Sequence, residues 1–77
     1  MTNHRHSQIA GIVGTNLRVW RARHAVTQAD LARRMEMSQG YFSRVEQGEK
    51  CLSLETLERL AAEIGVPVRD LISADGG

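Results

Sequence analysis

The sequence of 77 residues has a single cysteine, three aromatic residues and no long apolar run. Its only cysteine, Cys51, cannot form a disulfide within the chain. No apolar stretch approaches the roughly 18 residues that a membrane-spanning helix needs, and no apolar core of a secretory signal peptide is present. These absences predict a cytoplasmic protein without a membrane partner.

Sequence motifs of enzymes are missing as well. There is no glycine-rich phosphate loop, no nucleophile elbow and no cluster of metal ligands. Cys51 has no histidine near it in the sequence, which favours an inert thiol over a nucleophile. His4 and His6 lie two positions apart, but no third ligand accompanies them. We therefore expect no catalysis, no metal site and no cofactor.

The charge of the chain is small in total and uneven in distribution. The net charge is +1. Up to Lys50 there are eight basic and four acidic residues, whereas from Cys51 onward there are two basic and five acidic residues. A basic first part favours an acidic partner such as nucleic acid. The alternative is an ordinary solvated surface on which the charges happen to segregate.

The stretch Val26–Gly48 predicts two short helices joined by a tight turn. Thr27 and Ser38 are each well placed to cap the start of one helix. Gly48 is placed to end the second helix in the left-handed conformation. A helix, a short turn and a helix rich in Gln, Ser and Arg is typical of a helix-turn-helix, whose second helix enters the DNA major groove.

The remainder of the chain predicts three more helices. Ser7 and Ser53 can cap the first and fourth helices, Gly65 can end the fourth, and Pro67 suits the start of the fifth. The expected fold is all-α, a five-helix bundle in one domain over residues 8–73, between a mobile tail at 1–7 and a C-terminal tail at 74–77. The expected helices lie near residues 8–24, 28–35, 39–47, 54–64 and 68–72.

Several short motifs connect the sequence to a known family: Thr27-Gln28, Leu31-Ala32, Tyr41-Phe42-Ser43, Val45-Glu46 and Ser53-Leu54-Glu55-Thr56-Leu57. With these residues the chain resembles the lambda-repressor-like (Cro/Xre) family of DNA-binding transcriptional regulators, over about residues 13–72. The resemblance implies that family's helical bundle and a sequence-specific regulator of double-stranded DNA.

The resemblance also implies which residues would contact DNA. Base contacts would come from Gln39, Gly40, Ser43 and Arg44, and phosphate contacts from Gln28, Arg33, Arg34, Tyr41 and Lys50. The chemistry is suitable, because a helix N-terminus attracts phosphate, arginine pairs with guanine and glutamine pairs with adenine. For Arg33, Arg34 and Lys50 an ordinary surface role is an equal alternative.

Arg21 lies four residues after Leu17, on the same inward side of the first helix, where a guanidinium needs a partner. An arginine and a glutamate at these positions commonly pair in the family, which implies an ion pair between Arg21 and Glu46. Two separate surface charges are the alternative.

At Ala25 the family often has glycine. A left-handed alanine would cost roughly 1 kcal/mol, so we expect the junction after the first helix to close differently.

A single small domain contacts few bases, so we expect a homodimer on an approximately palindromic operator, with RNA polymerase as a further partner and no small-molecule effector. The predicted dimer interface is Val66, Val68, Leu71 and Ile72, although these residues could instead close the chain's own core. Within the family, a restriction-modification controller protein and a phage-type repressor are both possible subgroups. An antitoxin or other protein-interaction module is the alternative function.

Overall fold

The computed structural model describes residues 4–74, with side chains from residue 8 onward. It has five α-helices: α1 (His4–His24), α2 (Gln28–Arg34), α3 (Gln39–Glu46), α4 (Leu54–Ile64) and α5 (Val68–Ile72). No strand occurs between residues 4 and 74. The predicted all-α fold with five helices is confirmed.

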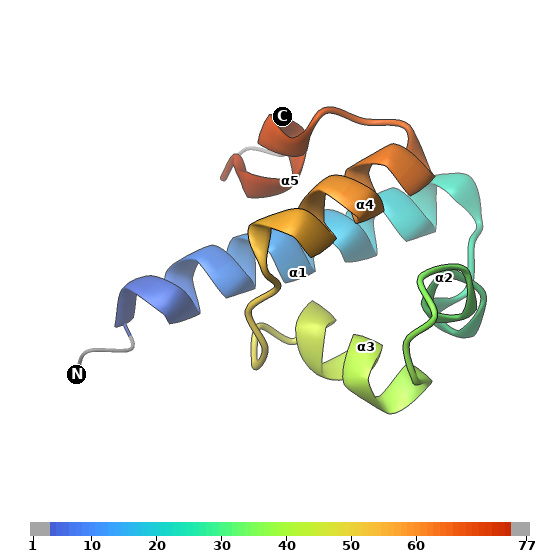
Figure 1. Cartoon of the computed structure of the whole chain (residues 1–77), viewed down its shortest axis with the longest axis horizontal. Helices are drawn as coiled ribbons and strands as arrows, with labels where there is room; N and C mark the ends of the chain where they lie inside the picture. Colours follow the sequence, from blue (N-terminus) through green and yellow to red (C-terminus); the bar gives the residue numbers. More distant parts are fainter. Residues whose placement is uncertain (1–3, 75–77) are drawn as a thin grey trace.

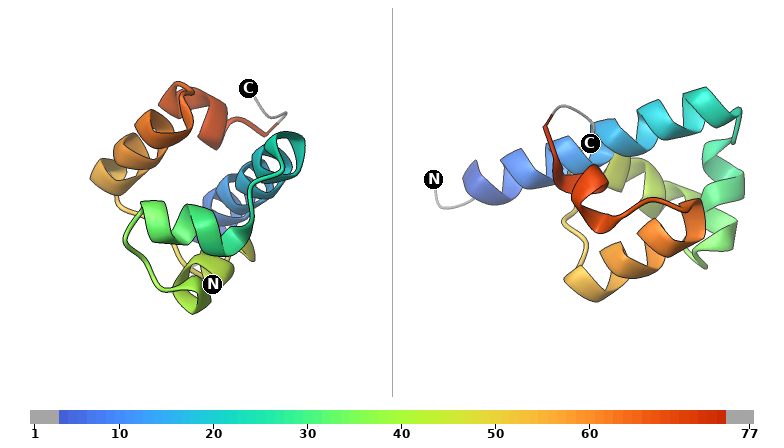
Figure 2. Two further views of the ribbon diagram at one scale, coloured as in Figure 1. Left: turned by 90° about the vertical axis from the view of Figure 1, so that its right-hand side faces the viewer. Right: turned by 90° about the horizontal axis from the view of Figure 1, so that it is seen from above.

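The long helix α1 extends along the length of the molecule (Figure 1). Helix α3 lies on one side of α1, and α5 lies on the other (Figure 1). Seen from above, α5 crosses α1 near its middle, with α4 beside it (Figure 2). This arrangement leaves α3 at the surface, on the side of α1 away from α5.

The core draws apolar side chains from every helix. Phe42, Leu17, Leu31 and Leu60 are its largest fully buried members. Burying each side chain of this size stabilises the fold by about 1.5–3 kcal/mol. Because Phe42 is buried in the core, its face of α3 points inward. Only the opposite face of α3 remains available for a partner.

The starts of three helices are capped as the sequence predicts. The hydroxyls of Thr27, Ser38 and Ser53 each accept a hydrogen bond from the backbone N–H three residues later, at 3.0, 3.1 and 3.1 Å. Each bond satisfies a backbone donor that has no partner within its helix. In the turn between α2 and α3, the cap at Ser38 fixes the residue at which α3 begins.

Four turns after helices contain a residue in the left-handed conformation. Two are the expected glycines, Gly48 and Gly65, with φ of 80° and 78°. The other two are Ala25, with φ 55°, and Glu36, with φ 59°. The expectation that the junction at Ala25 closes differently was therefore wrong. The closing hydrogen bond from the Val26 N–H to the carbonyl five residues back, 3.0 Å, offsets the strain of the left-handed alanine.

The ends of the elements differ from the expected bounds at a few places. Helix α1 begins at His4, so residues 4–7 of the predicted tail are helical and Ser7 is not the cap. No glycine or proline occurs between residues 4 and 10 to stop the helix. Residues 1–3 and 75–77, which make up the rest of the two predicted tails, lie outside the described residues. None of the described helices is both long and apolar enough to cross a membrane.

Candidate nucleic-acid interface

Helix α3 has one buried face and one exposed face. Its buried residues are Phe42, Val45 and Glu46. On the opposite side, at the helical period of 3.6 residues, lie the four residues predicted to read bases: Gln39, Gly40 and Arg44, which are exposed, and Ser43, which is partly buried. The structure thus brings the four predicted base contacts together on one face.

Helix α3 approaches α1 closely at Gly14. A Cβ atom added to Gly14 would lie 2.4 Å from the backbone oxygen of Glu46 and 2.7 Å from that of Val45. Only glycine allows this contact between the two backbones. Sequence reasoning missed it, because helix propensity alone counts a glycine in α1 as unfavourable.

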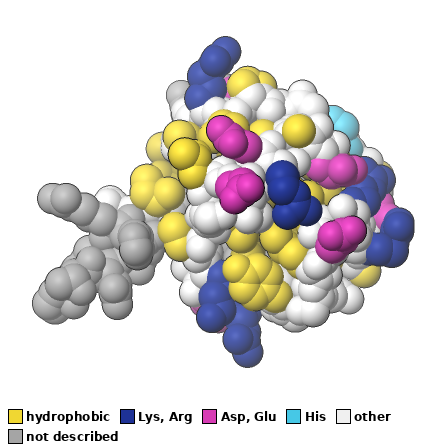
Figure 3. Space-filling view, in the orientation of Figure 1, with side chains coloured by type: hydrophobic (Ala, Val, Ile, Leu, Met, Phe, Trp, Pro, Cys, Tyr) yellow, Lys and Arg dark blue, Asp and Glu magenta, His cyan; other side chains and the backbone are white. Residues whose placement is uncertain are grey.

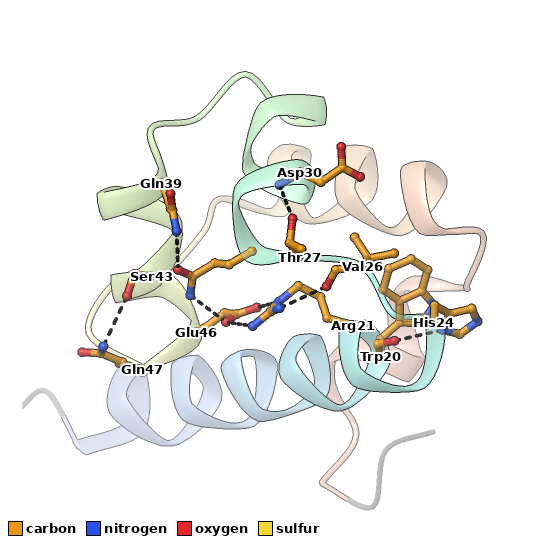
Figure 4. Close-up of polar contacts among 11 residues, drawn as sticks. Trp20, Arg21, His24, Val26, Thr27, Asp30, Gln39, Ser43, Glu46 and Gln47 are labelled. Carbon is orange, nitrogen blue, oxygen red and sulfur yellow. Dashed lines mark hydrogen bonds and ion pairs between the residues drawn. The ribbon is translucent and has the colours of Figure 1, made fainter.

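An ion pair between Arg21 and Glu46 also joins α1 to α3 (Figure 4). The Arg21 Nε and Nη2 donate to Glu46 Oε2 and Oε1 at 2.6 and 2.8 Å. The Glu46 side chain is 2% exposed and that of Arg21 is 20% exposed. The hydrogen bond to Glu46 raises the pKa of Arg21 above its usual value, against the opposing effect of burial, so the guanidinium stays charged. The buried carboxylate of Glu46 and the guanidinium of Arg21 therefore each have an oppositely charged partner.

Hydrogen bonds through two glutamines connect the same buried carboxylate to the surface. Gln28 Nε2 donates to Glu46 Oε1 at 3.0 Å. Gln39 Nε2 donates to Gln28 Oε1 at 3.4 Å. The predicted phosphate contact Gln28 and the predicted base contact Gln39, which are the first residues of α2 and α3, are thus linked to the ion pair. Among the described residues, no buried polar side-chain atom lacks a hydrogen-bond partner.

The other predicted phosphate contacts lie at the surface. Arg33 and Arg34 both form ion pairs with Asp30, the second at 2.8 Å. Such pairs along an exposed helix are weak, so a phosphate can compete for either arginine. Tyr41 and Lys50 are also exposed. The structure leaves all four side chains accessible to an anionic partner.

The predicted dimer residues fall into two groups. Leu71 is 2% exposed and belongs to the core, and Val66 and Val68 are partly buried against the same core. Only Ile72 is exposed, at 42%. The predicted interface is therefore wrong for Leu71, because α5 turns this side chain inward to fill the chain's own core.

Asn16 holds α5 against α1 and was not predicted from the sequence. Its Nδ2 lies within hydrogen-bond distance of the carbonyls of Asp70, Leu71 and Ser73, at 3.2, 2.8 and 3.0 Å. These carbonyls lie at the C-terminal end of α5, where no helical N–H can reach them. An asparagine on the partly apolar face of α1 was the one available signal for this contact.

An open groove of about 650 Å³ lies beside Asn16, between α1 and the segment that carries α5. Trp20 is partly buried at its edge and stacks on His24, with ring centroids 4.3 Å apart. Val19 lines the same groove and is 42% exposed.

Among the described residues no three metal-ligating side chains come together, and the side chains of His4 and His6 are not described.

The surface shows the same separation of charge as the sequence, in which basic residues predominate up to Lys50 and acidic residues after it. Figure 3 shows acidic side chains across the part of the surface over which α4 runs. The exposed acidic residues of α4 are Glu55, Glu58 and Glu63. The exposed basic residues closest to the candidate interface are Arg33, Arg34, Arg44 and Lys50, on α2, on α3 and in the loop after α3. Exposed basic side chains are therefore available to an anionic partner on the side of α2 and α3, although the exposed Glu36 and Glu49 lie there too.

The comparison with protein families finds a helix-turn-helix domain family that matches residues 12–74. The chain belongs to this helix-turn-helix family. Its assignment from the sequence to helix-turn-helix regulators is thereby confirmed. A comparison with curated proteins finds no match.

Solved structures of similar proteins have the same fold as this helix-turn-helix protein. Two are crystal structures of the clp gene regulator ClgR from Corynebacterium glutamicum, both 36% identical. They superpose with TM-scores of 0.79 and 0.78 and match 88% of this chain and 73% or 90% of the ClgR chain. A hypothetical transcription factor, NHTF from Neisseria, is 28% identical with a TM-score of 0.76, over 83% of this chain and 74% of that chain.

Proposed function

We propose that this helix-turn-helix protein is a transcriptional regulator that binds double-stranded DNA sequence-specifically, as a homodimer on an approximately palindromic operator. The observation that carries the proposal is the exposed face of α3, with Gln39, Ser43 and Arg44 on a helix whose other face is locked in the core. A helix held in this way is suited to entering the major groove. The similar solved structures, a gene regulator and a transcription factor, support the proposal.

Three side chains on this face of α3 suit particular bases. Arg44 can donate two hydrogen bonds to guanine, and Gln39 can pair with adenine. Ser43 can contact either base, while Gly40 contributes no side chain. Phosphate contacts would come from the second N–H of Gln28, from Tyr41 and from the basic residues Arg33, Arg34 and Lys50, which fix the register on the duplex.

The dimer would form on the side of the molecule that carries α5. Ile72 on α5 is 42% exposed, and Val19 on α1, also 42% exposed, lines the groove beside α5. A two-fold contact here would place two α3 helices about 34 Å apart, one turn of DNA. The resemblance to controller proteins makes a restriction-modification operon one candidate target.

Selection of bound DNA from a random pool, with purified protein, tests the proposal. We expect recovery of a two-fold symmetric site with half-sites about one helical turn apart. Absence of any enriched sequence would contradict it and would favour a protein-interaction module, such as an antitoxin.

Sedimentation of an Ile72→Glu variant tests the dimer. We expect a folded monomer that binds the full site more weakly but binds an isolated half-site as well as wild type does. Leu54→Glu is the matched control, since Leu54 is 67% exposed on α4 and lies outside the proposed contact. Leu71→Glu should instead unfold the chain, because Leu71 is in the core. A wild-type protein that stays monomeric on DNA would refute the dimer.

Arg44→Ala tests base reading. We expect this variant to lose about 1–3 kcal/mol of binding free energy on the selected site and less on random DNA. Lys50→Ala is the comparison for a phosphate contact and should weaken binding to both DNAs alike. Equal losses in Arg44→Ala would reassign this arginine to the phosphate backbone.

A further inference from the structure

The hydrogen bonds from Arg21 to Gln39 run in one direction. The carboxylate of Glu46, paired with a guanidinium, can only accept hydrogen bonds. Its Oε1 accepts from Arg21 Nη2 at 2.8 Å and from Gln28 Nε2 at 3.0 Å. The side of the Gln28 amide that faces Glu46 must therefore be its NH2 group.

The orientation of the Gln28 amide in turn determines how Gln39 can bond to it. If the Gln28 amide turned over, its carbonyl oxygen would lie about 3 Å from a carboxylate oxygen, and the two would repel. Gln28 Oε1 consequently faces Gln39 and accepts from Gln39 Nε2 at 3.4 Å. One of the two N–H groups of Gln39 is thereby taken, although the side chain itself is exposed.

We propose that Glu46 is a positioning residue for base recognition: through Gln28, its carboxylate fixes the orientation of the Gln39 amide and so favours adenine over guanine. This inference rests on the proposed function. With one N–H taken, Gln39 offers one donor and one acceptor to DNA. Adenine presents an acceptor at N7 and a donor at N6, whereas guanine presents two acceptors, N7 and O6.

The identity of residue 46 matters in this scheme. A glutamine at this position could place either its oxygen or its NH2 group beside Gln28, so both orientations of the Gln28 amide would become available. Gln39 would then be free to present two N–H groups, which suits guanine. The ion pair is thus expected to affect specificity as well as stability.

The test measures dissociation constants on the selected operator and on versions with single base-pair changes. Gln39→Ala first identifies the pair that Gln39 reads, as the one position where discrimination is lost. At that pair we expect wild type to prefer adenine over guanine by about 10- to 100-fold. In Gln28→Met and Glu46→Gln we expect this ratio to fall at least about fivefold, with discrimination at the other pairs unchanged.

Gln28→Met keeps the length of the side chain, removes the amide and leaves the ion pair intact, so it decides the outcome if Glu46→Gln does not fold. Arg33→Gln is the control for a phosphate contact and should weaken binding to every operator version by one common factor. A wild-type ratio in folded Gln28→Met would overturn the proposal while leaving the DNA-binding function in place. So would a Gln39→Ala variant that changes discrimination at no single pair. A wild-type protein that binds no DNA would overturn both the inference and the proposed function.

Discussion

Helix α1 makes two very different contacts, one with α3 and one with α5. Toward α3 the backbones meet at Gly14, and a buried ion pair joins Arg21 to Glu46. Toward α5 the contact depends on Asn16 and on a single fully buried side chain, Leu71, and an open groove lies beside it. The helix proposed to read DNA is thus held by a backbone contact and a buried ion pair, and the helix proposed to meet a second chain by hydrogen bonds from one side chain and one buried leucine.

The largest effect is expected from breaking the ion pair on the α3 side. Arg21→Met should lower the free energy of unfolding by roughly 3–5 kcal/mol, because Glu46 is left buried without its partner. Denaturant unfolding measures the loss. Arg23→Met, an exposed position on the same helix, should change stability by less than about 0.5 kcal/mol. A loss below about 1 kcal/mol in Arg21→Met would mean that water replaces the arginine.

The backbone contact on the same side is tested by Gly14→Ala. The new Cβ would lie 2.4 Å from a backbone oxygen, so α1 and α3 must separate, and we expect a loss of about 2–3 kcal/mol. Gly11→Ala is the matched control, since a Cβ there has nothing within 4 Å and alanine favours helix by up to about 1 kcal/mol. If both alanines stabilise the protein, the two helices are not in close contact.

The contact between α1 and α5 should be weaker than the contact between α1 and α3, and its loss should affect α5 alone. Asn16→Ala should cost about 1–2 kcal/mol, since three carbonyls lose their donor at a partly exposed site. Hydrogen exchange should show faster opening of α5, while α3 keeps its protection. Thr15→Ala, at the exposed neighbouring position, should leave α5 unchanged. Equal loosening of α3 and α5 in Asn16→Ala would show that the two contacts are not independent.

The smallest effect is a gain at the junction between α1 and α2. Ala25→Gly should stabilise the protein by about 0.5–1 kcal/mol, because glycine takes the left-handed conformation without strain. Thermal unfolding would detect a rise of a few degrees. The control is Ala29→Gly, inside α2, which should lose about 1 kcal/mol. A loss in Ala25→Gly would show that the entropy of the unfolded chain outweighs the strain.

The helices could be predicted from local chemistry, but some of their ends could not. Thr27, Ser38 and Ser53 marked three helix starts correctly, since a cap acts on the backbone only three residues away. Neither Ala25 nor Glu36 carries a local signal for its left-handed conformation, and at Ala25 only the glycine common in the resembled family pointed to one. The placement of Arg21 beside Glu46 was anticipated, whereas the hydrogen bonds from Glu46 to the two glutamines were not.

By itself the sequence determined the five helices, the exposed face of α3 and the helix-turn-helix class, because capping residues and apolar periodicity act over one or two helical turns. Only the tertiary structure decided that Gly14 is a contact point, that Leu71 serves the core and that Gln28 joins Gln39 to the ion pair. Those three roles depend on which residues of other helices lie opposite. Distances between helices are set by the packing of the whole core, which no local pattern encodes.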